Sequence, residues 1–224
     1  MIGTQADTFF DEHFFSFFRG VRKSRKTKSL RYRIAKRGVD FTTAVLALPV
    51  IVGVALVLVV LNPVANPGPL FFKQIRMGLG GKRFTLWKFR TMVSDNERIR
   101  SADDPVEASR ITPLGRIMRR LRIDELPNFF NVLSGDMCLV GPRPDTFGHA
   151  EEYIRSVPYY CKRFRVKPGI TGLAQVRGGY ADSPSAVRRK ARLDHFYVRR
   201  SSGRLDAYVI AKTLAVIATG FGAK

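Results

Sequence analysis

Cysteine and histidine are scarce in this chain of 224 residues, which has two cysteines and three histidines. Cys138 and Cys161 do not have the spacing of paired metal ligands, and two thiols cannot form a disulfide framework. His13, His149 and His195 are scattered along the sequence, so no histidine-rich metal site is expected. This cysteine usage is typical of a protein of the reducing cytoplasm.

Acidic residues are also few, because 18 Asp and Glu oppose 39 Lys and Arg and leave a formal net charge of +21. A charge of this size favours a polyanionic partner, which can be nucleic acid, an anionic membrane surface or a phosphorylated substrate. The length allows one domain, or one domain with a small appendage. We find no internal repeat.

One segment lacks charge altogether. Residues 42–61 read TTAVLALPVIVGVALVLVVL, and these twenty residues match the length of a transmembrane helix. The segment starts too late for a signal peptide and has no small-residue cleavage site after it. Basic residues flank it on both sides: residues 19–37 hold ten Lys and Arg, and residues 73–90 hold six more without an acidic residue. The positive-inside rule places both flanks in the cytoplasm.

Pro49 lies near the middle of the uncharged segment. Proline removes a backbone hydrogen bond and clashes with the preceding helical turn, so it can break a helix. A re-entrant helix–break–helix enters and leaves the membrane on one side and therefore satisfies both basic flanks. The alternative is an ordinary single-pass helix with a proline kink.

Short elements are predicted after this segment. Residues 70–74 and 83–90 are β-like runs separated by glycines, which indicates a small hairpin. Thr112 and Pro113 provide an N-cap and a first-turn proline for a helix. Apolar residues recur at helical spacing in that helix and arginines fill its remaining surface, the apolar ones being Leu114, Ile117, Met118 and Leu121. Such a basic amphipathic helix suits an anionic bilayer surface.

The segment 119–127 places three arginines beside two adjacent carboxylates, Asp124 and Glu125. Asp124 is predicted to be the N-cap of a helix that continues through residues 128–133 and stops at Gly135. A carboxylate at a helix N-terminus among arginines stays ionised and can act as a nucleophile. The same N–H groups and arginines can hold phosphate oxygens. The segment therefore indicates phosphoryl-type transfer through an acyl phosphate.

Taken together, these segments resemble the bacterial sugar transferase family. The resemblance runs from about Lys36 to Phe221, and its length is similar to the small class of that family. The stretches that carry it occur in the family's order, at residues 68–92, 111–144, 167–178 and 193–197. The chain departs from the family pattern at Arg122, where Ser or Thr is usual, at Asn128, where Gln is usual, and at Cys138, where Ser is common.

The resemblance implies an enzyme that transfers a sugar-1-phosphate from a UDP-sugar to undecaprenyl phosphate, at the start of exopolysaccharide, capsule or O-antigen assembly. Asp124 would attack the β-phosphorus, release UMP and carry the phosphosugar, with Glu125 as its partner in the dyad. Magnesium is the implied cofactor, held by Glu125 together with Asp124. Arg119 matches a phosphate-binding arginine of the family. Arg143 lies in the family's Pro-Arg-Pro element, between the structural prolines Pro142 and Pro144.

The predicted fold is α+β and helix-dominated: a monotopic membrane protein with a re-entrant helix, interfacial amphipathic helices and a β-hairpin. Its predicted parts are a basic N-terminal segment, 1–37, the membrane helix, 38–62, and a cytoplasmic catalytic domain, 63–224. We expect it at the bacterial inner membrane, facing the cytoplasm and in contact with anionic phospholipid. A homo-oligomer is left open.

Several alternatives remain at this stage. Arg119 and Arg143 either contact substrate or pair with the dyad. Lys88 and Arg90 alternate on a predicted strand, where they either bind phosphate or face the membrane surface. A nucleic-acid-binding protein explains the charge but not the uncharged segment, so no nucleic acid is expected. A non-catalytic membrane scaffold explains both features but has no need of Asp124.

Overall fold

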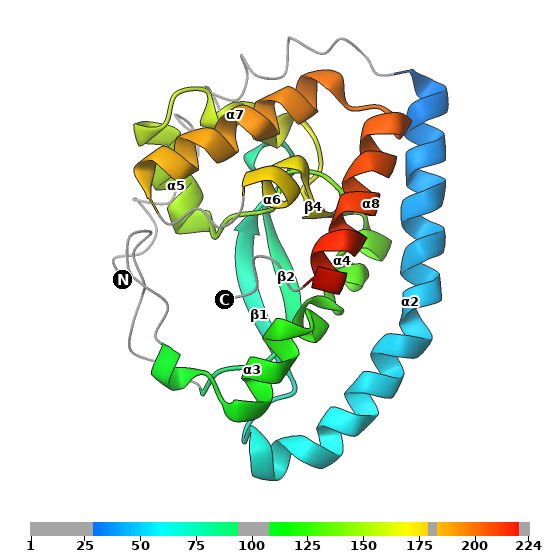
Figure 1. The fold of residues 1–224 in the computed structure, drawn as a ribbon, viewed down its shortest axis with the longest axis vertical. Coiled ribbons are helices and arrows are strands. Elements are labelled where there is room, and N and C mark those ends of the chain that lie inside the picture. The colour runs from blue at the N-terminus through cyan, green and yellow to red at the C-terminus, as the bar shows by residue number, and fades with distance from the viewer. Residues whose placement is uncertain (1–28, 94–107, 179–182, 220–224) are drawn as a thin grey trace, which may run out of the picture.

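The computed structural model describes residues 29–93, 108–178 and 183–219. Within these ranges helices predominate, and the strands form two separate two-stranded sheets (Figure 1). The predicted α+β, helix-dominated fold is therefore confirmed. Most of the predicted basic segment, 1–37, lies outside the described residues.

The longest element is α2, Leu30–Ala65, a helix of 36 residues with Pro49 and Pro63 inside it. It begins before the predicted membrane segment and is long and apolar enough to cross a membrane by length and composition. Figure 1 shows that α2 changes direction about midway along its length. Proline is a usual cause of such a bend, and Pro49 is in this part of the helix.

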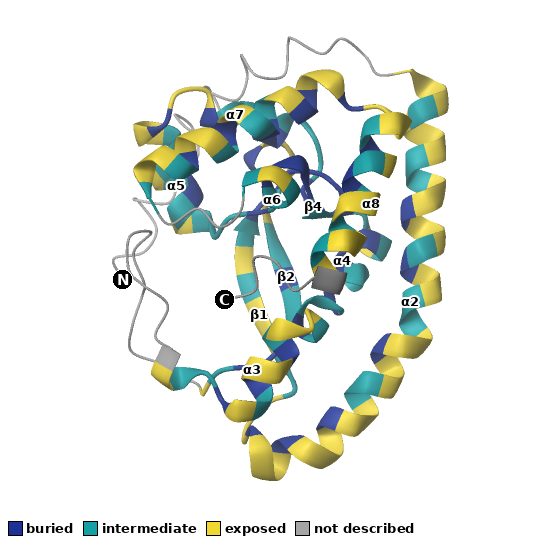
Figure 2. Ribbon diagram, viewed as in Figure 1, coloured by how far each residue is buried: buried dark blue, intermediate teal, exposed yellow. Residues whose placement is uncertain are grey.

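Burial on α2 is confined to one stripe (Figure 2). Ala44, Ile51 and Leu58 are buried, and their spacing of seven residues places them on one face of the helix. Ile51 and Leu58 pack with Phe89 and Met118 from elements that follow in the chain. The other faces of α2 expose apolar side chains, which include Leu46, Val50, Val60 and Val64.

The predicted hairpin is present. Strands β1, Phe71–Met77, and β2, Arg83–Phe89, pair antiparallel with Phe71 opposite Phe89. A short 3₁₀ turn, η1, Leu79–Gly81, joins them. Gly80 and Gly81 have φ values of 68° and 78°, a region that glycine adopts without the penalty paid by other residues.

The elements around the two adjacent carboxylates are short: η2, Ala108–Arg110, α3, Pro113–Arg120, η3, Ile123–Glu125, and α4, Asn128–Ser134. Thr112 caps α3 as predicted, and its hydroxyl accepts a hydrogen bond from the Gly115 N–H at 3.0 Å. Gly135 ends α4 as predicted, with φ of 86°.

The predicted N-cap role of Asp124 is wrong. Asp124 lies inside η3, and α4 begins four residues later at Asn128, after Pro127. The cause is Arg122, whose left-handed φ of 59° ends α3 and turns the chain into η3 before α4 can start. Asp124 therefore belongs to a separate helical turn.

The remaining elements form the rest of the domain: β3, Cys138–Val140, α5, Phe147–Ser156, η4, Tyr160–Arg165, β4, Gly169–Thr171, α6, Leu173–Gly178, α7, Pro184–Arg200, and α8, Gly203–Thr219. Strands β3 and β4 pair parallel, with Cys138 opposite Gly169. A core formed around Tyr160, Phe164 and Val187 joins η4 to α7.

Two basic residues of α2 connect this helix to the rest of the domain through an ion pair and hydrogen bonds. Lys36 Nζ lies 2.9 Å from Asp206 Oδ2 of α8 and donates to the Val140 carbonyl at 2.9 Å. Arg37 donates to the Val132 and Leu133 carbonyls at 2.6 and 3.0 Å, at the C-terminal end of α4. These two members of the basic flank therefore serve internal contacts, and Arg37 meets the negative end of the α4 dipole.

Candidate active site

Glu125 is the centre of a cluster of cations. Arg143 donates to both of its carboxylate oxygens, at 3.0 Å from Nη1 to Oε2 and 2.5 Å from Nη2 to Oε1. Lys88 Nζ lies 3.2 Å from Oε1, and Arg122 Nη1 lies 3.8 Å from the same oxygen. Burial alone would raise the pKa of Glu125, but the charges of Arg143 and Lys88 outweigh burial and hold this pKa well below its usual 4.5.

Asp124 is adjacent to Glu125 but has a different environment. Its ion-pair partner is Lys88, whose Nζ lies 3.8 Å from Oδ2. Burial raises the pKa of Asp124 above its usual 3.8, and the attraction of Lys88 is opposed by the repulsion of Glu125. The Arg143 fork contacts Glu125 and not Asp124, so the charges of Arg119 and Arg143 lower the pKa of Asp124 by less than burial raises it. That Asp124 is ionised and acts as a nucleophile stays a prediction.

Lys88 connects the two carboxylates from the hairpin. Its side chain is mostly buried, and burial lowers its pKa while the charge of Glu125 raises it. The structure thus brings Lys88, Asp124, Glu125 and Arg143 together, as the sequence predicted for a common site. Whether Lys88 binds phosphate stays a prediction.

Arg90 is not part of this cluster. It follows the last residue of β2 and is 4% exposed. Its guanidinium donates to the Pro69 carbonyl at 2.7 Å, to the Met92 carbonyl at 3.1 Å and to the Asn66 carbonyl. The predicted phosphate-binding role is not supported, since these bonds use Arg90 to join the end of α2 to the hairpin.

Arg119 lies in the last turn of α3 and donates from Nε to Thr91 Oγ1 at 2.9 Å. The charge of Arg119 also lowers the pKa of Asp124 and thereby favours the ionised form of that carboxylate. Arg122, which the sequence left without a role, supplies the left-handed residue between α3 and η3 and extends toward Glu125.

Two residues near Arg143 were missed by sequence reasoning. Arg76 of β1 donates to the Pro144 carbonyl at 3.0 Å, and burial lowers its pKa to about 10, with Arg143 acting in the same direction. Asn128 is 2% exposed, and its Oδ1 has no hydrogen-bond partner among the described residues. Arg76 carries no local motif that could have revealed this position, and Asn128 was noted only as a departure from the family pattern.

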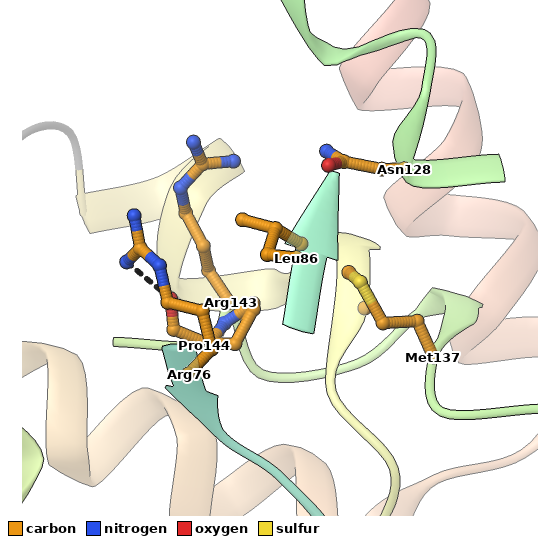
Figure 3. A pocket seen from close by; sticks show the side chains of 7 residues that line it. Arg76, Leu86, Asn128, Met137, Arg143 and Pro144 are labelled. Carbon is orange, nitrogen blue, oxygen red and sulfur yellow. Dashed lines mark hydrogen bonds between the residues drawn. The ribbon is translucent and has the colours of Figure 1, made fainter. Parts of the chain in front are cut away.

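A cavity of about 10 Å³ lies between these residues and is lined also by Leu86, Met137 and Gly169. Figure 3 shows the Arg76 and Arg143 side chains running alongside each other on one side of it, with Asn128 on the other. Its volume is that of a single water molecule. A separate open groove of about 560 Å³ lies between the hairpin and α4 and is lined by Trp87 and Phe130 among others, without Asp124 or Glu125.

Metal-ligating side chains do not gather in the described ranges, where no group of three or more His, Cys, Asp or Glu residues is suited to a metal ion. Cys138 and Cys161 are free thiols.

The bacterial sugar transferase family model matches residues 31–220. The chain belongs to this family. The sequence resemblance is thus confirmed, and the matched range contains all of α2 except Leu30, the hairpin and every residue of the cluster.

Three relatives show how far the similarity extends. UDP-N-acetylgalactosamine-undecaprenyl-phosphate N-acetylgalactosaminephosphotransferase of Aeromonas hydrophila is 42% identical, over 86% of this chain and 46% of the relative. UDP-glucose:undecaprenyl-phosphate glucose-1-phosphate transferase of Escherichia coli is 37% identical, over 81% of this chain and 40% of the relative. The uncharacterized sugar transferase EpsL of Bacillus subtilis is 39% identical, over 84% and 90% respectively. The chain thus spans less than half the length of the first two relatives.

Proposed function

We propose that this chain transfers a sugar-1-phosphate from a UDP-sugar to undecaprenyl phosphate. Two relatives are named for this type of transfer, and both are similar over more than four-fifths of this chain. The observation that carries the proposal is the unequal pairing of the two carboxylates: Glu125 is paired with Arg143 at 2.5 Å, while the ion-pair partner of Asp124 among the described residues is Lys88, at 3.8 Å.

In this proposal Asp124 is the nucleophile. Its carboxylate oxygen bonds to the β-phosphorus of the UDP-sugar, the bond from that phosphorus to the oxygen shared with the α-phosphorus breaks, and UMP leaves with the electron pair. A phosphate oxygen of undecaprenyl phosphate then attacks the same phosphorus and expels the Asp124 carboxylate. A covalent intermediate lets a soluble donor and a lipid acceptor use one site in turn.

The cations have a defined task in both steps. Charge accumulates on the phosphoryl oxygens and the leaving group in the transition state, and fixed positive groups stabilise it. Lys88 lies beside both carboxylates, which supports assigning it a contact with a phosphate that approaches Asp124. We assign a phosphate contact to Arg119 as well, whereas Arg143 is committed to Glu125.

Magnesium fits the carboxylates unequally. Mg²⁺ commonly binds through one or two carboxylates together with substrate phosphates, and would neutralise the charge of the leaving phosphate here. Asp124 fits as its protein ligand. Glu125 accepts hydrogen bonds from Arg143 and Lys88 at Oε1 and from Arg143 at Oε2, so a second lone pair of Oε2 is the position it would offer to a metal.

We infer that α2 is re-entrant and that the domain lies on the cytoplasmic face of the inner membrane. Both ends of the helix contact the same domain, through Lys36 and Asp206 near its start and through Asn66 and Arg90 just after its end. A helix that crossed the bilayer once would place its ends on opposite sides. The exposed apolar faces of α2 supply the surface that lipid would cover.

The proposed function predicts the effect of removing the nucleophile. Asp124→Asn should abolish UMP release from every UDP-sugar in a panel, in the presence of magnesium and undecaprenyl phosphate. UMP formation is followed by a coupled assay. Asp136→Asn, at an exposed carboxylate that accepts a hydrogen bond from Ser134, is the matched control and should keep wild-type rates.

Normal turnover by Asp124→Asn would show that Asp124 is not the nucleophile. If the unaltered protein released UMP from no UDP-sugar, the non-catalytic scaffold would replace the transferase as the better interpretation.

A further inference from the structure

The backbone that carries Arg143 is held at four successive carbonyls. The Gly169 N–H donates to the Pro142 carbonyl at 3.0 Å, and the Met77 N–H donates to the Asp145 carbonyl at 3.2 Å. Arg76 Nη1 donates to the Pro144 carbonyl at 3.0 Å. The fourth carbonyl, that of Arg143 itself, accepts a hydrogen bond from Arg163 Nη2. This segment is therefore held from β4, from β1 and from η4.

Arg163 is buried, with 3% of its surface exposed, and has two carboxylate partners. Its Nη1 is paired with Asp145 Oδ2, and its Nη2 lies 3.0 Å from Asp194 Oδ2 of α7. Lys190, also on α7, donates to the other oxygen of Asp145 at 2.5 Å. One guanidinium thus connects α7 to Arg143 and Asp145.

The Arg163 guanidinium makes one hydrogen bond besides its two ion pairs with carboxylates. Burial would lower the pKa of Arg163, but the charges of Asp145, Tyr160 and Asp194 outweigh burial and raise it, and the two carboxylates lie beside the buried cation as its counter-charges. The hydrogen bond from Nη2 to the Arg143 carbonyl is not needed for that compensation. Its consequence is to fix the position of the residue whose side chain holds Glu125.

We propose that Arg163 is a positioning residue, which fixes the Arg143 backbone and thereby sets the two-bond approach of the Arg143 guanidinium to Glu125. The proposal rests on the proposed function only where it predicts an effect on sugar-phosphate transfer. A bidentate arginine–carboxylate pair needs both N–H groups in one plane with both oxygens, so a backbone shift of about 1 Å is enough to disrupt it.

The first test uses Arg163→Lys, which keeps a positive charge beside Asp145 but cannot also reach the Arg143 carbonyl with a second planar nitrogen. We expect kcat for UMP release to fall by about 10- to 100-fold, as for other small displacements of catalytic groups. In the double variant with Arg143→Lys, kcat should fall no further than in Arg143→Lys alone, because both changes act through one pair. Effects that multiply would overturn the proposal.

The second test needs no activity. Phenylglyoxal modifies accessible arginines, and mass spectrometry of peptides measures its rate at Arg143. This rate should rise several-fold in Arg163→Lys and stay unchanged in Lys36→Met, a control that breaks a partly buried ion pair between α2 and α8. An unchanged rate at Arg143 in Arg163→Lys would overturn the proposal even if the protein proved to have no transferase activity.

A milder variant covers the case in which Arg163→Lys does not fold, as judged by its thermal unfolding in detergent. Asp194→Asn keeps the size of the side chain and removes only one of the two carboxylate charges on Arg163. It should raise the labelling of Arg143 and lower kcat in the same directions, with smaller amplitudes. A folded Asp194→Asn protein with wild-type labelling and wild-type kcat would count against the proposal.

Discussion

At the scale of residues, the adjacent carboxylates are distinguished by their surroundings. Both are largely buried, yet the pKa of Asp124 is raised and that of Glu125 is lowered. The difference arises because the planar fork of Arg143 meets Glu125 and not Asp124. Two neighbouring groups whose pKa values are driven apart are suited to different tasks, which supports the proposal that Asp124 reacts while Glu125 stays an anion.

Lys88 should set the acidic limit of activity. Its charge lowers the pKa of Asp124, whereas burial and Glu125 raise it. Lys88→Met removes the largest effect that lowers the pKa of Asp124. Burial and the charge of Glu125 still raise this pKa, and the smaller effects of Arg119 and Arg143 are all that lower it, so the pKa of Asp124 rises. Because the nucleophile must be ionised, UMP release should then be lost at a higher pH than in the unaltered protein. The measurement is kcat/KM between about pH 4 and pH 8.

Lys73→Met is the matched control for this profile. Lys73 lies on β1 over the Trp87 ring, 4.3 Å from its centroid, and should leave the acidic limb in place. If the acidic limb of the kcat/KM profile moved to lower pH in Lys88→Met, or did not move, Lys88 would not govern the ionisation of Asp124.

At the scale of elements, local rules located the ends of helices where neighbouring residues decide them. Thr112 caps α3 and Gly135 ends α4 through contacts within a few residues, so both were predictable. The turn η3 was not predictable, since Arg122 has a left-handed backbone that non-glycine residues adopt uncommonly. That turn displaced Asp124 from its expected capping position.

The parallel pair of β3 and β4 depends on the close approach of two glycines. A Cβ added at Gly169 would lie 2.1 Å from the backbone nitrogen of Gly141, so the strands would have to separate. Gly169→Ala should therefore cost about 1–3 kcal/mol or more of unfolding free energy. The same separation would disturb the bond from Gly169 to Pro142 and lower transfer activity.

Chemical denaturation in detergent measures this cost. The matched control is Gly148→Ala in α5, where an added Cβ meets nothing within 4 Å and should stabilise the helix by about 0.5–1 kcal/mol. Equal stability of the two alanine variants would contradict the steric argument.

At the scale of the whole molecule, α2 is both the most apolar element and a bonded part of the domain. Its start is attached through Lys36 and Arg37, and Asn66, which follows its end, donates to the Arg90 carbonyl at 2.8 Å. A membrane segment attached at both ends to one domain can dip into the bilayer from one side. The net charge of +21 then matches an anionic membrane surface on that side.

The topology can be tested by cysteine labelling after Cys138 and Cys161 have been replaced by alanine. Ser29→Cys lies just before α2 and Ala65→Cys lies at its last residue. A re-entrant helix predicts that a membrane-impermeant maleimide labels both of these flanking cysteines in inside-out vesicles and neither in intact spheroplasts. Val50→Cys, near the bend, is the control and should resist labelling from either side. Labelling of only one flanking cysteine from the outside would indicate a single-pass helix.

The sequence by itself determined the family, the helix-dominated class, the hairpin and the presence of a long apolar helix with a central proline. These features depend on composition, periodicity and motifs that neighbouring residues define. It also identified Asp124, Glu125, Lys88 and Arg143 as candidates, all four within stretches shared with the family.

Only the tertiary structure decided how those candidates are paired. It placed Arg143 on Glu125, turned Arg90 toward backbone carbonyls and brought Arg163 from a distant 3₁₀ helix to the Arg143 backbone. Such pairings join residues that are far apart in the chain, and burial sets their strength. Neither separation nor burial can be read from the order of the residues, because both arise only when the elements pack together.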